Sequence, residues 1–343
     1  MTIPVYLRAV GTALPGSPVT NAMLAERFNM STTWEQWVDT FIGTSTRYLS
    51  VDLATGEPRY SLADLGETAA RRALDAAGTT PGDVDLMVMG TSSPDQLMPA
   101  TVNVIADRLG INDVRAYQLQ SGCTGAIQAL DVARQMLLTG RHTTALVLGG
   151  DITAKHYDPT LDLNSLPPAQ QVNGLLFGDG VGAVVLATEA SRGAALIRHI
   201  HLRLTGLGRT PGQVVDWYGA AGDDSVVGIA VREEYKAIEE SVPVMACDTL
   251  DQMLAHLDWK KIDLDYLLPP QLSGKMTARI SERLDVPDAE EISCVEETGN
   301  TGNALPFLQL ERLLPVAEPG DRAMVIAIES SKWIESGLAL EMN

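Results

Sequence analysis

The 343-residue chain has little cysteine: only Cys123, Cys247 and Cys294, all far apart. This number and spacing exclude a disulfide framework and give no metal-binding pattern, so no metal site is expected. No stretch is apolar over the 18 or more residues of a membrane helix, and the first residues lack the pattern of a signal peptide. These absences predict a cytoplasmic protein.

Basic residues are also few. The chain has 25 lysines and arginines against 44 aspartates and glutamates, which gives a formal net charge of −19. Such a charge opposes binding to nucleic acids and to anionic membranes, so neither is expected as a partner. One local basic patch is still compatible with this total.

Two segments of the chain repeat one pattern of helix end, turn and buried strand. Residues 73–90 and 253–270 share this order, and Asp85 corresponds to Asp265. The apolar strand at residues 145–151 also recurs in the second half. The distance along the chain between its two copies is almost the same as that between Asp85 and Asp265. Two such matches indicate a duplicated unit of about half the chain.

Helices alternate with apolar strands along both repeats, which is typical of an α/β protein with buried sheets. The first half is predicted to cover residues 1–188 and the second residues 189–343. No linker rich in proline or serine separates them. The halves are therefore expected to pack as one body.

Cys123 lies between a predicted strand at residues 114–119 and a predicted helix at residues 126–138. The unpaired N–H groups and the dipole at the start of a helix favour a thiolate, which is the nucleophilic form of cysteine. A small buried core residue is the alternative for a lone cysteine. The residues around it leave both interpretations open.

Asn300 belongs to the turn at residues 298–303, which precedes a predicted helix at residues 305–314. In the duplicated pattern this helix corresponds to the helix after Cys123. The two helix starts should then meet between the halves, a common place for a ligand site. A plain turn with a helix cap is the alternative.

Several segments together resemble the ketoacyl-acyl-carrier-protein synthase III family of the thiolase superfamily over nearly the whole chain. They are residues 34–38 with Gly43, residues 90–94, the Cys123 loop, residues 177–183 and residues 299–301. The resemblance implies a thiolase-like α/β fold, in which two duplicated halves form a five-layered αβαβα sandwich, and a homodimer without a cofactor. It also implies that Cys123 carries the acyl group and that Asn300 is the catalytic asparagine.

The histidine of the family is missing. Residues 269–273 align with the family's histidine motif, and Pro270 stands at the histidine position. Proline cannot titrate or donate a hydrogen bond through its side chain. The resemblance is therefore to a divergent acyltransferase or condensing enzyme that need not decarboxylate a malonyl group.

The resemblance assigns further roles around the acyl tunnel. Backbone N–H groups of Cys123 and Ser331 are expected to bind the oxyanion. Phe41 and Trp37 are expected at the tunnel, together with Met98, which would reach across the dimer interface. The arginine that contacts coenzyme A in the bacterial enzymes falls near Phe41, which weakens the case for coenzyme A as the donor.

Lys275, Arg279 and Arg283 follow the Pro270 motif at four-residue spacing, so they share one helix face. The resemblance places this helix beside the tunnel mouth, where it would dock an acidic acyl carrier protein. A solvated basic face is the alternative.

Three functions are compatible with these observations. The favoured one is acyl transfer through acyl-Cys123, from a carrier-protein thioester to an oxygen, nitrogen or activated carbon nucleophile, in natural-product (polyketide-type) biosynthesis. The second is decarboxylative Claisen condensation, which Pro270 disfavours. The third is a non-catalytic partner subunit of a synthase, which the presence of both Cys123 and Asn300 disfavours.

Overall fold

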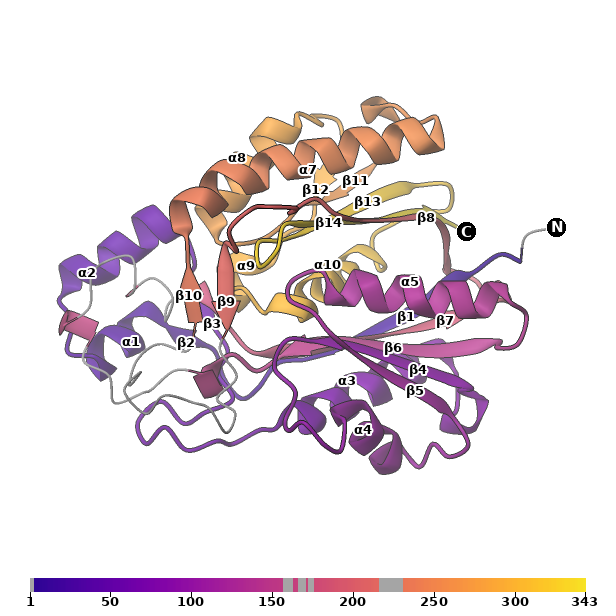
Figure 1. Cartoon of the computed structure of the whole chain (residues 1–343), viewed down its shortest axis with the longest axis horizontal. Helices are drawn as coiled ribbons and strands as arrows, with labels where there is room; N and C mark the ends of the chain where they lie inside the picture. The colour runs from indigo at the N-terminus through magenta and orange to yellow at the C-terminus, as the bar shows by residue number, and fades with distance from the viewer. Residues whose placement is uncertain (1–2, 157–162, 166–170, 172–175, 216–230) are drawn as a thin grey trace.

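The computed structural model describes residues 3–156, 163–165, 171, 176–215 and 231–343 (Figure 1). Its main sheet has ten strands in the order β12-β11-β13-β14-β8-β1-β7-β6-β4-β5. These strands are β1 (Tyr6–Ala13), β4 (Leu86–Thr91), β5 (Arg115–Gln120), β6 (Thr144–Asp151), β7 (Gly180–Ala187), β8 (Ala195–Leu204), β11 (Tyr266–Leu268), β12 (Glu290–Glu291), β13 (Arg322–Glu329) and β14 (Ile334–Met342).

The two ends of this sheet repeat one topology. The order β5-β4-β6-β7-β1 in the first half matches β12-β11-β13-β14-β8 in the second. In each half the second strand of this order pairs in parallel with both neighbours, and the later pairs are antiparallel. The halves join where Tyr6 and Leu7 of β1 pair with Leu196 and Ala195 of β8. The predicted boundary between residues 188 and 189 falls in the connection from β7 to β8.

Helices divide the molecule into five layers, which Figure 1 shows stacked from α7 and α8 down to α3 and α4. The outer helices α3 and α4 pack on the first half of the sheet, and α7 and α8 cover the second. The helices α5 and α10 lie between the two half-sheets. The predicted thiolase-like αβαβα sandwich is confirmed. The helices of these layers are α3 (Leu62–Ala77), α4 (Thr101–Leu109), α5 (Gly125–Leu138), α7 (Tyr235–Leu257), α8 (Gly274–Leu284) and α10 (Leu305–Leu313).

Shorter elements connect the strands and helices of these layers. The helices are α1 (Asn21–Arg27), α2 (Thr32–Trp37) and α9 (Val295–Thr298), with single turns at Val38–Ile42, Pro81–Asp83, Ala154–His156, Leu163–Ser165, Lys261–Asp263 and Gly302–Ala304. The strands form two small sheets, β2 (Val19–Thr20) with β3 (Thr46–Arg47) and β9 (Gln213–Val215) with β10 (Val231–Glu233).

Alternation of side chains along the central strands explains why they are apolar throughout. In β4, Leu86 and Val88 belong to the core cluster that includes α5, whereas Met87 and Met89 belong to the cluster under α3. Successive side chains of a strand point to opposite faces, and here both faces are covered by helices. The predicted ends of the strands and helices around Cys123 and Asn300 agree with the structure to within one residue.

Among the described residues, no helix combines the length and apolarity needed to cross a bilayer. The same part of the chain holds no cluster of three or more histidine, cysteine, aspartate or glutamate side chains arranged to bind a metal ion.

Candidate active site

Cys123 lies in a tight turn between β5 and α5, two residues before the helix begins. The backbone N–H of Gly125 donates to the carbonyl oxygen of Gly122 at 2.8 Å and closes this turn. A Cβ atom on Gly125 would lie 2.5 Å from Oδ1 of Asn303, so the close approach of the second half requires glycine here. The predicted position of Cys123 at the start of a helix is confirmed.

Glu329, the last residue of β13, holds this turn in place. Its Oε2 accepts hydrogen bonds from the hydroxyl groups of Ser121 at 2.9 Å and Thr124 at 2.7 Å. The backbone N–H of Thr124 donates to the same oxygen at 3.4 Å, and the Ser331 hydroxyl donates to Oε1. A carboxylate from the second half therefore positions the cysteine turn of the first half.

Asn300 lies in the turn after α9 and is only 6% exposed. Its Oδ1 accepts a hydrogen bond from the backbone N–H of Gly302 at 3.0 Å, and its own N–H donates to the Leu176 carbonyl at 2.7 Å. These contacts fix the amide and leave Nδ2 as the group that can donate to a ligand. The orientation fits hydrogen bonding to a thioester or enolate oxygen.

Cys123 and Asn300 line one cavity of about 310 Å³ between the halves. Pro270 lines the same cavity, so the position expected for histidine contributes no titratable group to the cavity wall. Gln271, the next residue, also lines the cavity, but its Oε1 accepts hydrogen bonds from the backbone N–H groups of Cys294 and Val295 at 2.9 and 2.8 Å. No histidine lines this cavity among the residues that the structure describes.

The resting state of Cys123 differs from the expectation. Burial raises the pKa of its thiol most strongly, and the carboxylates of Glu329, Asp151 and Glu233 raise it further. The backbone N–H of Cys123 acts in the opposite direction and has the smallest effect. The helix start was expected to favour the thiolate, but burial and three acidic side chains act against it and outweigh the start of α5.

Glu233, at the end of β10, is a cavity residue that the sequence analysis did not identify. Burial raises the pKa of its carboxyl, although Tyr235 and Gln213 act to lower it. No motif surrounds this residue, and it is buried through the pairing of two three-residue strands, β9 and β10. Such short strands carry too little sequence pattern to be predicted.

The predicted tunnel residues are only partly brought together. Phe41 lines the cavity, although it is 64% exposed. Trp37 packs near it, with 6.2 Å between the ring centroids, but does not line the cavity. Ser330 rather than Ser331 lines the cavity, and the Ser331 hydroxyl faces Glu329 instead.

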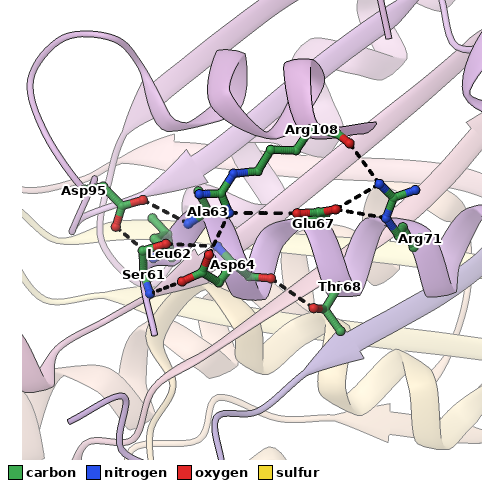
Figure 2. A network of polar contacts seen from close by, with 9 residues as sticks. All are labelled: Ser61, Leu62, Ala63, Asp64, Glu67, Thr68, Arg71, Asp95 and Arg108. Atoms are coloured by element: carbon green, nitrogen blue, oxygen red, sulfur yellow. Dashed lines mark hydrogen bonds and ion pairs between the residues drawn. The ribbon is translucent and has the colours of Figure 1, made fainter. Parts of the chain in front are cut away.

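Met98 is 87% exposed and does not line the cavity of its own chain. Its loop is held at Asp95, whose carboxylate accepts hydrogen bonds from the N–H groups of Leu62 and Ala63 at the start of α3 (Figure 2). The Lys155 ammonium group also binds two carbonyl oxygens of this loop. An anchored loop thus displays an apolar side chain to solvent, and its role in a dimer stays a prediction.

The three basic residues occupy one exposed side of α8, as their spacing predicts. Lys275 and Arg279 line the cavity, whereas Arg283 lies further along the helix. Arg279 forms an ion pair with Glu239 of α7 at 2.5 Å. Docking of a carrier protein at this face stays a prediction.

Comparison with known sequences gives the family. The sequence model of 3-oxoacyl-[acyl-carrier-protein] synthase III matches residues 117–206, and that of its C-terminal region matches residues 254–330. The beta-ketoacyl-[acyl-carrier-protein] synthase III of Sphingopyxis alaskensis is 30% identical over 315 residues, which cover 91% of this chain and 90% of that protein. The enzyme of the same name from Rhizobium meliloti is 31% identical over 307 residues, or 89% and 88%. The chain belongs to this synthase III family.

Solved structures agree with this assignment. The synthase superposes on AbyA1, described as a tetronic acid condensing enzyme, with a TM-score of 0.95 and 57% identity, covering 98% of this chain and 99% of that one. The Pseudomonas aeruginosa 3-oxoacyl-(acyl carrier protein) synthase III gives a TM-score of 0.83 at 26% identity, covering 98% of both chains. The synthase is therefore a condensing acyltransferase, and the interpretation as a non-catalytic subunit is set aside.

Proposed function

We propose that this synthase carries an acyl group on Cys123 and transfers it to an already acidic carbon, without decarboxylation, in the assembly of a tetronic acid. The observation that carries this proposal is Pro270, which faces the same cavity as Cys123 and Asn300. The acyl carrier and an amide donor are kept, but the side chain used in malonyl decarboxylation is absent. The similarity to a tetronic acid condensing enzyme supports the product class.

The chemistry of the product fits a site of this kind. A tetronic acid is a five-membered lactone with a ring carbon between two carbonyl groups. Assembly from a β-ketoacyl thioester and a hydroxyacyl thioester needs one C–C bond and one C–O bond, and each bond forms with loss of a thiol. The carbon between a ketone and a thioester already loses a proton readily, so no carbon dioxide need be released.

The cavity supplies groups suited to the first of these bonds. Cys123 would hold the hydroxyacyl group as a thioester. Its backbone N–H donates no hydrogen bond to another backbone group among the described residues. That N–H and Nδ2 of Asn300 can donate to oxygens that gain negative charge during attack. The hydroxyl of the bound acyl group then attacks the second thioester and closes the ring.

The proposed substrates are carried on an acyl carrier protein. Lys275 and Arg279 form part of the cavity wall on a chain whose net charge is −19. Cations at this position would steer the acidic surface of a carrier toward the cavity. The family name, which refers to acyl carrier protein, supports this choice of donor.

Intact-protein mass spectrometry tests the proposal. The synthase is exposed to a panel of acyl thioesters, and the expected result is one adduct that Cys123→Ala abolishes and Cys247→Ala retains. Addition of a β-ketoacyl carrier thioester should discharge the adduct and give a product without release of carbon dioxide. Stoichiometric carbon dioxide from malonyl carrier protein, dependent on Cys123 and Asn300, would instead support decarboxylative Claisen condensation.

A further inference from the structure

The cavity needs a group that accepts protons, because Pro270 cannot. Removal of a proton from the attacking carbon requires a base within reach, whichever thioester is loaded first. Among the residues that the structure describes, the titratable side chains that line the cavity are those of Cys123, Glu233, Tyr235, Glu239, Lys275 and Arg279. Only two of these are carboxylates, so Glu233 and Glu239 are the first candidates.

Glu239 is poorly placed for this role. Its side chain is 55% exposed and forms an ion pair with Arg279 at 2.5 Å, at the outer wall of the cavity. A carboxylate that is already paired with a guanidinium group gives up that ion pair when it takes a proton. Glu233 has no such partner among the described residues and is largely buried.

The two carboxylate oxygens of Glu233 differ in their hydrogen bonding. Oε1 accepts a hydrogen bond from Nε2 of Gln213 at 2.6 Å. Oε2 is buried and has no close hydrogen bond within the described part of the chain, although the Tyr235 hydroxyl is near enough to act to lower the pKa of this carboxyl. An oxygen of this kind can accept a proton from a ligand without losing an existing hydrogen bond.

The carboxylate oxygens of the other two acidic residues near the cysteine turn, Asp151 and Glu329, already accept hydrogen bonds. Oδ1 of Asp151 accepts hydrogen bonds from Ser92 and Ser93, and its Oδ2 accepts two from Asn303. Glu329 receives donors on both oxygens from the cysteine turn and from Ser331. Protonation of either carboxylate would displace donors that position the active site.

We propose that Glu233 is the general base of this synthase and occupies the functional place that Pro270 leaves empty. Its carboxylate lines the same cavity as Cys123, is near enough to raise the pKa of that thiol, and is held by Gln213 through Oε1 while the buried Oε2 has no close hydrogen bond among the described residues. The inference rests on the proposed function, because it assigns the proton acceptor for acyl transfer at Cys123. Burial also raises the pKa of this carboxyl, which strengthens it as a base near neutral pH.

Protons balance over both half-reactions. In loading, Glu233 takes the thiol proton of Cys123, the sulfur attacks the donor thioester, and the departing carrier thiolate recovers the proton from Glu233. In condensation, Glu233 takes a proton from the carbon between the two carbonyl groups. That carbon forms a bond to the acyl carbonyl, the C–S bond to Cys123 breaks, and the Cys123 thiolate recovers the proton from Glu233.

The test compares Glu233→Gln with Glu234→Gln. The first variant keeps the size and a hydrogen-bond acceptor for Gln213 but cannot take a proton. The second changes an exposed neighbouring carboxylate that lies outside the cavity and makes no side-chain cap hydrogen bond. After loading of Cys123 to completion, single-turnover condensation should fall about 10²–10⁴-fold in Glu233→Gln and remain unchanged in Glu234→Gln.

A second readout isolates the proton transfer from acyl transfer. In deuterated water, the synthase should speed exchange of the acidic protons of a β-ketoacyl carrier thioester, even in Cys123→Ala. Glu233→Gln should reduce this exchange to the uncatalysed rate. Exchange and condensation at wild-type rates in folded Glu233→Gln would overturn the assignment of the base.

Two further outcomes keep the inference separate from the proposed function. Absence of any Cys123 adduct in the wild-type protein would contradict the proposed function, whereas a normal adduct with unimpaired Glu233→Gln contradicts only the inference. If Glu233→Gln does not fold, Glu233→Asp replaces it. This shorter carboxylate should condense at least about tenfold more slowly, and wild-type turnover in that variant would overturn the inference.

Discussion

Asp151 and Glu329 end the equivalent strands β6 and β13, and each accepts hydrogen bonds from the active-site turn of the opposite half. Asp151 Oδ2 accepts from the backbone N–H and the side-chain amide of Asn303, both at 2.9 Å. Glu329 Oε2 accepts from the Thr124 hydroxyl at 2.7 Å. The duplicated halves thus position each other's turns, and the site depends on their packing.

Asp151→Asn should destabilise the whole protein. The substituted amide presents N–H donors where Asp151 now accepts from Asn303, and a buried donor left unpaired costs about 1–3 kcal/mol. We expect the free energy of unfolding to fall by about 2–4 kcal/mol in urea titrations. Asp107→Asn, on the exposed side of α4, is the control. Equal stability of the two variants would contradict the proposed coupling of the halves.

The sequence was sufficient to predict a duplicated α/β protein and the meeting of Cys123 with Asn300, whereas the five layers were expected from the resemblance to the synthase III family. Buried strands of a covered sheet are apolar on both faces, so β6 and β13 stand out as continuous runs at equivalent places. The turns that follow the duplicated pattern then have to meet between the halves. Both predictions depend on local patterns within contiguous segments.

The charge around Cys123 could not be predicted in this way. Glu329, Asp151 and Glu233 lie far from the cysteine in sequence, and only the folded chain brings their carboxylates near the thiol. A helix start is visible in the sequence, whereas burial and distant charges are not. The protonation state and the base Glu233 therefore required the structure.

Alkylation of Cys123 should be slow in the unloaded synthase. Burial, Glu329, Asp151 and Glu233 raise the pKa of the thiol, so less thiolate is present at pH 8 than for an ordinary cysteine. Each unit of pKa above pH lowers the thiolate fraction about tenfold. We expect the rate with iodoacetamide, measured by peptide mass mapping, to keep rising above pH 9.

Glu233→Gln gives the matched comparison for alkylation. Removal of one nearby negative charge should lower the pKa of Cys123 and speed alkylation at pH 8, even though turnover falls. A rate in the wild-type protein that levels off below pH 8 would show a low-pKa thiol and contradict this account.

Asn300→Ala and Asn303→Ala should separate catalysis from stability. Asn300 lines the cavity and its Nδ2 is oriented to donate to substrate, so its loss should lower turnover about 10²–10³-fold. Asn303 instead joins Asp151, Ser121 and Ala126 through hydrogen bonds. Its loss should mainly lower the melting temperature. A large loss of stability with normal turnover per folded molecule in Asn300→Ala would leave that residue as a helix cap.

Met98→Trp tests the predicted dimer. An anchored loop holds Met98 and Leu97 at 87% and 75% exposure in the single chain, and apolar side chains displayed in this way mark a contact surface. We expect a homodimer in which Met98 reaches the acyl tunnel across the interface. Sedimentation should then give a dimer at micromolar concentration, and Met98→Trp should shift acyl-chain preference toward shorter chains.

The dimer and the tunnel role of Met98 can be contradicted separately. A monomer at micromolar concentration would exclude a stable dimer. An unchanged chain-length preference in a dimeric Met98→Trp variant would remove the tunnel role while leaving the dimer. Val316→Trp, at an exposed site that does not line the cavity, controls for the added bulk.

Charge reversal on α8 should weaken the use of carrier-bound substrates. Lys275→Glu with Arg283→Glu places negative charge beside the cavity, where an acidic carrier protein is expected to dock. Steering contacts act mainly on the association rate and weaken with salt. We expect kcat/KM for a carrier thioester to fall about tenfold or more at low salt, with little change for an acyl-N-acetylcysteamine.

Four comparisons make the docking prediction specific. Arg141→Glu with Arg192→Glu changes the net charge equally at exposed turns outside the cavity, and should leave the carrier reaction nearly unchanged. Glu239→Gln should act in the opposite direction to the reversals on α8, because it releases Arg279 from its ion pair and makes that guanidinium available to the carrier. Equal losses with both substrates would show that the α8 reversals damage the fold. Coenzyme A esters that react as well as carrier thioesters at every salt concentration would contradict carrier docking.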